Sequence, residues 1–197
     1  MDSETKLLSG GMLMLSVATS ALVVLPYMLV GDVPATAGLQ PYTAAQLRGR
    51  EVYIQSGCVY CHSQQPRAKN FAPDTARGWG RASVAGDYAF DAPHLLGTMR
   101  TGPDLFNIGA RQSSAAWQLG HLYQPRAFVP GSIMPGYRFL FDTKAKAEPS
   151  DVLVGLPPAH QPAGQVVVAT PAALDLVAYL LALNHTAPVL AREGAPR

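Results

Sequence analysis

The chain has 197 residues, of which 48% are apolar and 14% are charged. A typical soluble domain has about 25% charged residues, so this low charge content excludes a disordered polyelectrolyte. The 15 basic and 13 acidic side chains leave a formal net charge of +2, too little to bind nucleic acid through bulk charge. Two cysteines cannot form a disulfide framework, and the composition predicts one globular domain with an unusually apolar segment attached.

The apolar segment lies near the N-terminus. From Leu7 to Val30 the chain has 24 residues without a charge, which as a helix would be about 36 Å long and would cross a bilayer core of about 30 Å. A cleaved signal peptide is the alternative, because Ala35–Ala37 resembles a small-x-small cleavage site. The run is longer than the usual signal core of about 7 to 15 residues. We therefore expect residues 1–31 to form a retained transmembrane anchor.

Small and hydroxylated side chains on the anchor predict a helix partner in the membrane. Ser16 and Ser20 lie four residues apart and hence on one face, where small side chains let a second helix approach. Pro26, in the last turns, could kink the exit of the helix. Residues 32–42 are rich in Gly, Pro and Ala and are expected to form a linker. The domain is then expected at residues 43–186 and a tail at residues 187–197.

The sequence C-V-Y-C-H at residues 58–62 is the attachment signature of a c-type haem. Two thiols on one tight helical turn reach the two vinyl groups of the porphyrin, and the adjacent imidazole reaches the iron. A thioredoxin-like dithiol would need a βαβ context, and a zinc site would need a second pair of ligands. We therefore expect one covalent haem c, attached to Cys58 and Cys61, with His62 as an axial iron ligand.

A haem iron in an electron carrier needs a sixth ligand, for which Met and His are the candidates. Met134 lies between Pro130 and Pro135, in a loop stiff enough to hold a thioether at a fixed distance. Met99 lies beside Arg100 and is expected to pack instead. We expect Met134 to be the second axial ligand. The histidines that remain as alternatives are His94, His121, His160 and His185.

Between the two expected ligands lies R-T-G-P-D-L, at residues 100–105. In small c-type cytochromes a G-P-x-L segment runs along the proximal face of the haem, where the proline carbonyl accepts the Nδ1–H of the ligand histidine. Pro103 and Leu105 are therefore expected in the haem pocket. Haem propionates also favour cations beside them. The arginines that could supply such a cation are Arg67, Arg81, Arg100, Arg111 and Arg126.

Two segments predict the helical frame of the domain. Residues 42–55, with Thr43 as N-cap, and residues 172–184 carry apolar side chains at helical spacing. A first helix before the C-x-x-C-H motif and such a last helix resemble the frame of a class I cytochrome c domain. In an insert at about 142–170, Val152–Val154 and Val166–Val168 could pair as a short β-hairpin. The expected fold class is mainly α, a single transmembrane helix followed by a class I cytochrome c domain.

Five segments together resemble the membrane-anchored mono-haem cytochrome c subunit (subunit II, FixO/CcoO) of cbb(3)-type haem–copper oxidases. They are residues 49–64 (GREVYIQSGCVYCHSQ), 83–88 (SVAGDY), 100–105 (RTGPDL), 121–126 (HLYQPR) and 132–137 (SIMPGY). The likeness covers Arg48 to about Phe141 and, more loosely, the anchor and the last helix. After Phe141 the sequence lacks the charged helical segment that this family leads us to expect.

The resemblance implies haem thioethers at Cys58 and Cys61, and axial ligands at His62 and Met134. It implies that the chain relays electrons to an integral-membrane catalytic subunit that reduces oxygen to water. A further c-type cytochrome subunit or a soluble cytochrome c is expected as the electron donor. No catalysis is expected from this chain alone, because the catalytic centre of the family lies in the other subunit.

Haem c is attached on the outer side of the bacterial inner membrane. The anchor is therefore expected to span that membrane once, in contact with its lipid. The haem domain is expected in the periplasm and the N-terminus in the cytoplasm. Two other functions remain open at this point. One is the cytochrome c subunit of a nitric oxide reductase, and the other is a free-standing membrane-tethered electron carrier.

Overall fold

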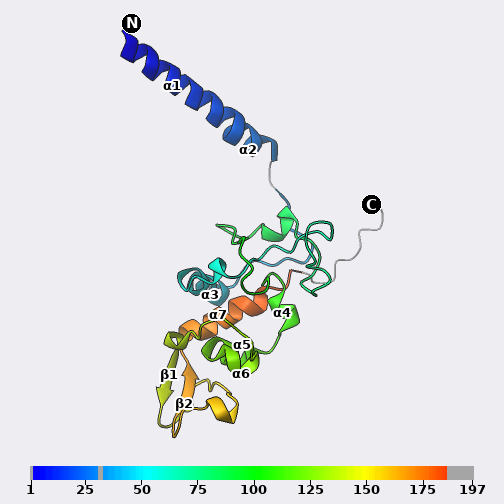
Figure 1. Cartoon of the computed structure of the whole chain (residues 1–197), viewed down its shortest axis with the longest axis vertical. Helices are drawn as coiled ribbons and strands as arrows, with labels where there is room; N and C mark the ends of the chain where they lie inside the picture. The colour runs from blue at the N-terminus through cyan, green and yellow to red at the C-terminus, as the bar shows by residue number, and fades with distance from the viewer. Residues whose placement is uncertain (1, 31–32, 186–197) are drawn as a thin grey trace.

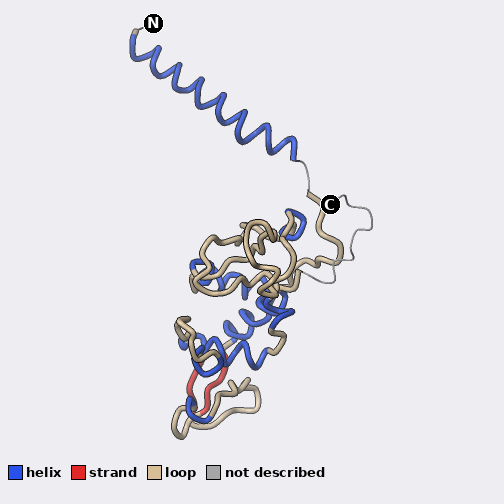
Figure 2. Tube along the Cα trace, turned by 45° about the vertical axis from the view of Figure 1, so that its right-hand side comes forward, coloured by secondary structure: helices blue, strands red, loops and turns tan. Residues whose placement is uncertain are grey.

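The computed structural model describes residues 2–30 and 33–185, so the tail expected at 187–197 lies outside the described residues. Two short strands lie at the end of the domain remote from where the anchor joins it (Figures 1 and 2). A mainly helical fold with an apolar N-terminal helix and a small β element confirms the expected fold class. The elements are α1 (Ser3–Thr19), α2 (Leu25–Val30), α3 (Ala44–Gln55), α4 (Ile108–Arg111), α5 (Ala115–Tyr123), α6 (Pro125–Phe128), β1 (Phe141–Lys144), β2 (Val166–Ala169) and α7 (Pro171–Ala182).

The N-terminal helix is continuous and exposed. Asp2 caps α1, because its carboxylate accepts a hydrogen bond from the Thr5 backbone N–H at 2.9 Å. A π-helical turn at Ser20–Val24 joins α1 to α2 just before Pro26, whose ring has no N–H to donate. From Ser3 to Leu29 the helix has 27 residues, is long and apolar enough to cross a membrane, and has no buried part.

The segment after the anchor is hydrogen-bonded to the domain. The Thr36 N–H donates to the Gly86 carbonyl at 3.0 Å, and its hydroxyl donates to Asp87 at 2.8 Å. Asp87 is buried, forms an ion pair with Arg81 at 2.5 Å, and accepts the Val84 N–H at 2.8 Å. The S-V-A-G-D-Y segment therefore holds the chain at Thr36 against the domain.

Helices α3 and α7 pack across each other and form the frame of the domain. Thr43 and Gln46 cap the start of α3 reciprocally, and the Thr170 hydroxyl caps α7. Both helices lie where the sequence analysis predicted them. At the crossing, a Cβ on Gly49 would lie 1.8 Å from the backbone oxygen of Asp175. The two backbones are thus closer together than any side chain at residue 49 would allow.

Gly49→Ala is expected to destabilise the domain by about 2–3 kcal/mol, because the added methyl group must push α7 away. Gly155→Ala is the matched control, since a Cβ on Gly155 would have no neighbour within 4 Å among the described residues. Denaturant unfolding of the two purified variants, followed by circular dichroism, measures the difference. Equal unfolding midpoints in the two variants would contradict the close crossing.

Strand β2 has partners on both edges. It pairs antiparallel with β1 along its whole length. On its other edge Leu153 forms a bridge with Val168, and the Val154 N–H donates to the Val167 carbonyl at 2.9 Å. The antiparallel contact expected between 152–154 and 166–168 is therefore present. The longer pairing with β1 was not predicted, because the sequence F-D-T-K lacks the apolar β-branched run that indicates a strand.

A buried histidine lies at the end of the described chain. The His185 ring stacks on Phe106 with a centroid distance of 4.4 Å, and its Nδ1 has no hydrogen-bond partner among the described residues. Burial lowers the pKa of His185 to about 4. The folded domain therefore holds this imidazole in its neutral form near neutral pH.

Acidification is expected to destabilise the domain through His185. Below the ordinary imidazole pKa of about 6.5, the unfolded chain binds a proton that the folded domain does not bind until about pH 4. The free energy of unfolding therefore falls through this window, by up to about 3 kcal/mol. His185→Phe should remove this part of the pH dependence, whereas His160→Phe, at an exposed position, should keep it. Urea unfolding at neutral pH and near pH 4 tests this, and the same pH dependence in both variants would contradict it.

Candidate functional site

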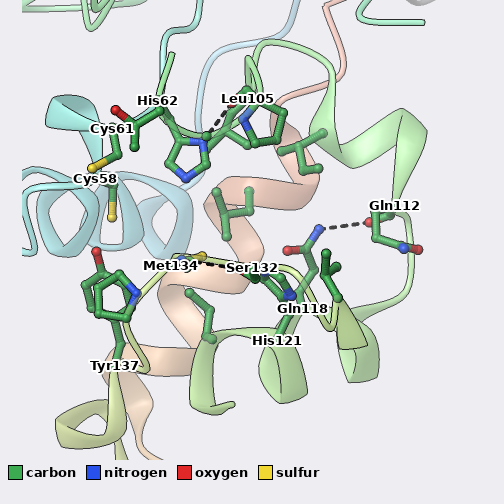
Figure 3. A pocket seen from close by; sticks show the side chains of 18 of the residues that line it. Cys58, Cys61, His62, Leu105, Gln112, Gln118, His121, Ser132, Met134 and Tyr137 are labelled. Atoms are coloured by element: carbon green, nitrogen blue, oxygen red, sulfur yellow. Dashed lines mark hydrogen bonds between the residues drawn. The ribbon is translucent and has the colours of Figure 1, made fainter. Parts of the chain in front are cut away.

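A cavity of about 470 Å³ lies between the 58–62 motif, α5 and the loop at 129–137 (Figure 3). Its size is in the range of about 300–1,000 Å³ that is usual for cofactor and ligand sites. Most of its lining is apolar, and none of the described lining residues is Asp or Glu. The six residues expected to bind haem all line it: Cys58, Cys61, His62, Pro103, Leu105 and Met134.

The two cysteines lie on one tight turn at one end of the cavity (Figure 3). Gly57, with φ of 73°, starts the turn, and the N–H groups of Cys61 and His62 donate to the Cys58 carbonyl at 3.1 and 3.0 Å. The thiols form no disulfide with each other. Burial raises the pKa of the Cys58 thiol to about 11, whereas redox-active C-x-x-C motifs lower it. The geometry therefore favours two fixed attachment points over dithiol redox chemistry.

The His62 ring is held in one orientation. Its Nδ1–H donates to the Pro103 carbonyl at 2.7 Å, and because a carbonyl can only accept, the lone pair is on Nε2. Nε2 points into the cavity (Figure 3). Gly102 lies against the ring, since a Cβ there would be 2.2 Å from Cε1 of His62. Burial lowers the pKa of His62 and so favours the neutral imidazole, which is the form that binds a metal.

A buried polar network holds the loop that follows His62. The Asp104 carboxylate accepts hydrogen bonds from the Ser63 hydroxyl at 2.6 Å and the Gln65 N–H at 2.8 Å. Arg100 donates to Asp74 at 2.5 Å and to the Gln65 carbonyl at 2.8 Å. Sequence reasoning did not identify this network, because its members become neighbours only in the folded chain. The R-T-G-P-D-L segment therefore holds the 63–65 loop as well as lining the cavity.

Met134 lies on the opposite side of the cavity from His62 (Figure 3). Its N–H donates to the Ser132 hydroxyl at 3.2 Å, and the Tyr137 N–H donates to the Leu122 carbonyl at 2.8 Å. The second bond ties the Met134 loop to α5. Met99 is 55% exposed and does not line the cavity.

One histidine of the four considered as alternatives also lines the cavity. His121 stacks on Trp117 with a centroid distance of 4.5 Å, and its Nδ1 is buried without a hydrogen-bond partner in the described chain. Of the side chains considered as the second axial ligand, the fold therefore brings Met134 and His121 to the wall opposite His62. The remaining candidates lie outside the cavity lining: His94, His160 and His185.

The five arginines considered as partners of haem propionates lie in different surroundings. Arg81 is paired with Asp87, and Arg100 is paired with Asp74. Arg111 alone among the five lines the cavity. Arg126 is exposed, and the guanidinium of Arg67 lies over the Phe71 ring at 5.6 Å.

The residues present fit a porphyrin iron. The cavity is apolar, its two thiols lie at one end, and an imidazole nitrogen and a thioether lie on opposite walls. His and Met together hold the iron in cytochrome c electron carriers and raise its reduction potential. Because His62 and Met134 could both bind an iron held in the cavity, the arrangement would suit electron transfer rather than the binding of a substrate at the iron.

A protein-family model described as "Cytochrome C oxidase, mono-heme subunit/FixO" matches residues 2–153. The matched part contains the apolar N-terminal helix, the 58–62 motif and Met134, and it extends beyond Phe141. Strand β2 and helix α7 follow the matched part. No curated protein matches the chain.

Proposed function

Because the chain belongs to the FixO family of mono-haem cytochrome c oxidase subunits, we propose that it is the electron-relay subunit of a cbb(3)-type haem–copper oxidase. It accepts electrons from a donor cytochrome and passes them to the haems of the integral-membrane catalytic subunit. The observation that carries the proposal is the convergence of two cysteines, His62 and Met134 on one apolar cavity inside the family match.

Each residue of the site would contribute to this function. Cys58 and Cys61 would hold the haem through thioethers, and His62 and Met134 would bind its iron. When bound, the haem supplies a one-electron redox couple. The Pro103 carbonyl keeps the His62 ring in place, and the apolar walls exclude water. Rigid ligands and a dry cavity favour fast electron transfer, because little has to rearrange when the charge changes.

The anchor places this domain near the membrane surface. Because haem c is attached on the outer side of the bacterial inner membrane, the domain lies in the periplasm and the N-terminus in the cytoplasm. From Val30 at the end of α2 to Thr36, six peptide units span at most about 21 Å. Since Thr36 is bonded to Gly86 and Asp87, this part of the domain stays within that distance of the helix end, close to a membrane-embedded partner.

Purification of the tagged full-length chain in mild detergent tests the proposal. Co-purification of a haem-bearing membrane subunit, with dominant oxygen consumption and little nitric oxide turnover, is the expected result. Dominant nitric oxide turnover would instead assign the chain to a nitric oxide reductase. Recovery of a reducible cytochrome alone, without either activity, would contradict the relay role and favour a free-standing tethered carrier.

A further inference from the structure

A basic loop, residues 67–77, leaves the domain close to the segment that comes from the anchor. The base of the loop is closed where the Ser83 N–H donates to the Pro66 carbonyl at 3.0 Å. Ser83 lies three residues before Gly86, whose carbonyl accepts the Thr36 N–H. Because the chain from the end of α2 to Thr36 spans at most about 21 Å, the base of the basic loop lies near the surface of the membrane that the anchor would cross.

The outer surface of the basic loop carries positive charge. Lys69 and Arg77 are exposed and Arg67 is half-buried, and in the part of the chain that the structure describes none of the three forms an ion pair. The one acidic residue in the sequence of the loop is Asp74. Its carboxylate is fully buried and accepts hydrogen bonds from Arg100 and from the Arg67 N–H. The loop therefore presents a positive face that attracts anions.

An exposed aromatic ring lies among these cations. Phe71 is 77% exposed, and the guanidinium of Arg67 lies 5.6 Å from the centroid of its ring. The guanidinium of Arg77 lies over the Trp79 ring at 5.0 Å. Basic side chains around an exposed ring are typical of a surface that lies on a membrane, where the ring enters the headgroup layer and the cations meet lipid phosphates.

We propose that the basic loop binds the anionic phospholipid headgroups of the membrane that the anchor spans. Lys69 and Arg77 contact the phosphates, and the Phe71 ring enters the headgroup layer. Such attraction acts only within about one Debye length, roughly 10 Å at 0.1 M salt, and the anchor holds the loop near enough for it. This second contact limits rotation of the domain about the linker. The inference needs the anchor in a membrane but not the electron relay, so it can fail independently of the proposed function.

Photo-crosslinking of the full-length chain in lipid nanodiscs tests this contact. The photoreactive analogue p-benzoylphenylalanine replaces Phe71 or, as a matched control, Phe139. Phe139 is 71% exposed and lies just before β1, at the end of the domain remote from the anchor (Figure 1). The nanodiscs contain phosphatidylcholine alone or phosphatidylcholine with phosphatidylglycerol, and mass spectrometry measures the lipid adducts after irradiation.

Two double variants, each carrying the photoreactive residue at 71, test the role of charge. Lys69→Gln with Arg77→Gln removes two positive charges from the basic loop. Arg126→Gln with Lys146→Gln removes two positive charges at exposed positions outside the loop. Circular dichroism first establishes that each variant is folded.

We expect several-fold more lipid adducts at residue 71 than at residue 139, and several-fold more with phosphatidylglycerol than without it. The loop double variant and high salt should each remove the preference for phosphatidylglycerol, whereas the control double variant should keep it. The comparisons of lipid and salt use the native charges, so they decide the matter if the loop variant fails to fold.

Equal adduct yields at residues 71 and 139, or equal yields at residue 71 in the two lipid mixtures, would overturn the proposal. Irradiation of native membranes gives a further test. If residue 71 there crosslinks to a protein subunit and not to lipid, the basic loop is a protein interface and the proposal is wrong. None of these results bears on oxygen consumption by the purified complex, which tests the proposed function separately.

Discussion

Replacing Met134 with leucine is expected to lower the reduction potential of the haem by tenths of a volt. Axial ligands shift haem potentials over about 0.8 V, and a methionine thioether opposite a histidine favours the reduced iron. Leucine preserves the size and apolarity of the side chain but has no lone pair to offer. The variant should therefore also lose the charge-transfer absorption of a methionine–iron(III) bond. Potentiometric titration and absorption spectroscopy of the oxidised protein measure the two effects.

Met99→Leu is the matched control, because it makes the same chemical change at an exposed position outside the cavity. It should leave the potential and the absorption band unchanged. His121→Phe tests the other side chain on the wall opposite His62. If His121→Phe lowered the potential and Met134→Leu did not, the assignment of Met134 as the sixth ligand would be wrong.

The double variant Cys58→Ser and Cys61→Ser is expected to lose covalent haem and most of the domain's stability. Without the haem, the apolar walls of the roughly 470 Å³ cavity would lose their packing partner, and unfilled apolar space destabilises a fold. We therefore expect the haem to act as part of the hydrophobic core.

Each single serine variant would keep one cysteine for a thioether and should retain haem with reduced stability, which separates attachment from general damage to the fold. Intact-protein mass spectrometry measures the attached haem, and thermal unfolding followed by circular dichroism measures stability. A double variant that lacks haem yet unfolds at the temperature of the wild-type protein would contradict a role for the haem in the core.

The local features of this chain could be predicted from the sequence. Thr43 precedes an apolar helical pattern with a glutamine three residues later, which is a capping box, and α3 starts there. The 58–62 motif depends only on spacing within one turn, and the structure places both cysteines on that turn. The charge-free run near the N-terminus likewise depends only on composition, and it forms the 27-residue apolar helix.

Features that depend on contacts between distant segments could not be predicted in this way. The sequence contains no sign that Gly49 meets the backbone of Asp175, because this contact arises only when α3 crosses α7. The bond from Thr36 to Asp87 likewise joins two loop segments without periodicity. The fold was also needed to show that Arg111, alone among the five arginines considered as propionate partners, lines the cavity. Nothing in the sequence around these arginines distinguishes them in this respect.

The relay of electrons through this chain is tested most directly in the purified complex with its catalytic subunit. The haem of the chain is reduced fully, oxygen is admitted, and its absorption is followed together with oxygen consumption. We expect this haem to be reoxidised at least as fast as the complex turns over, and Met134→Leu to change the rate. A haem that stays reduced while the complex consumes oxygen would contradict the relay of electrons through this chain.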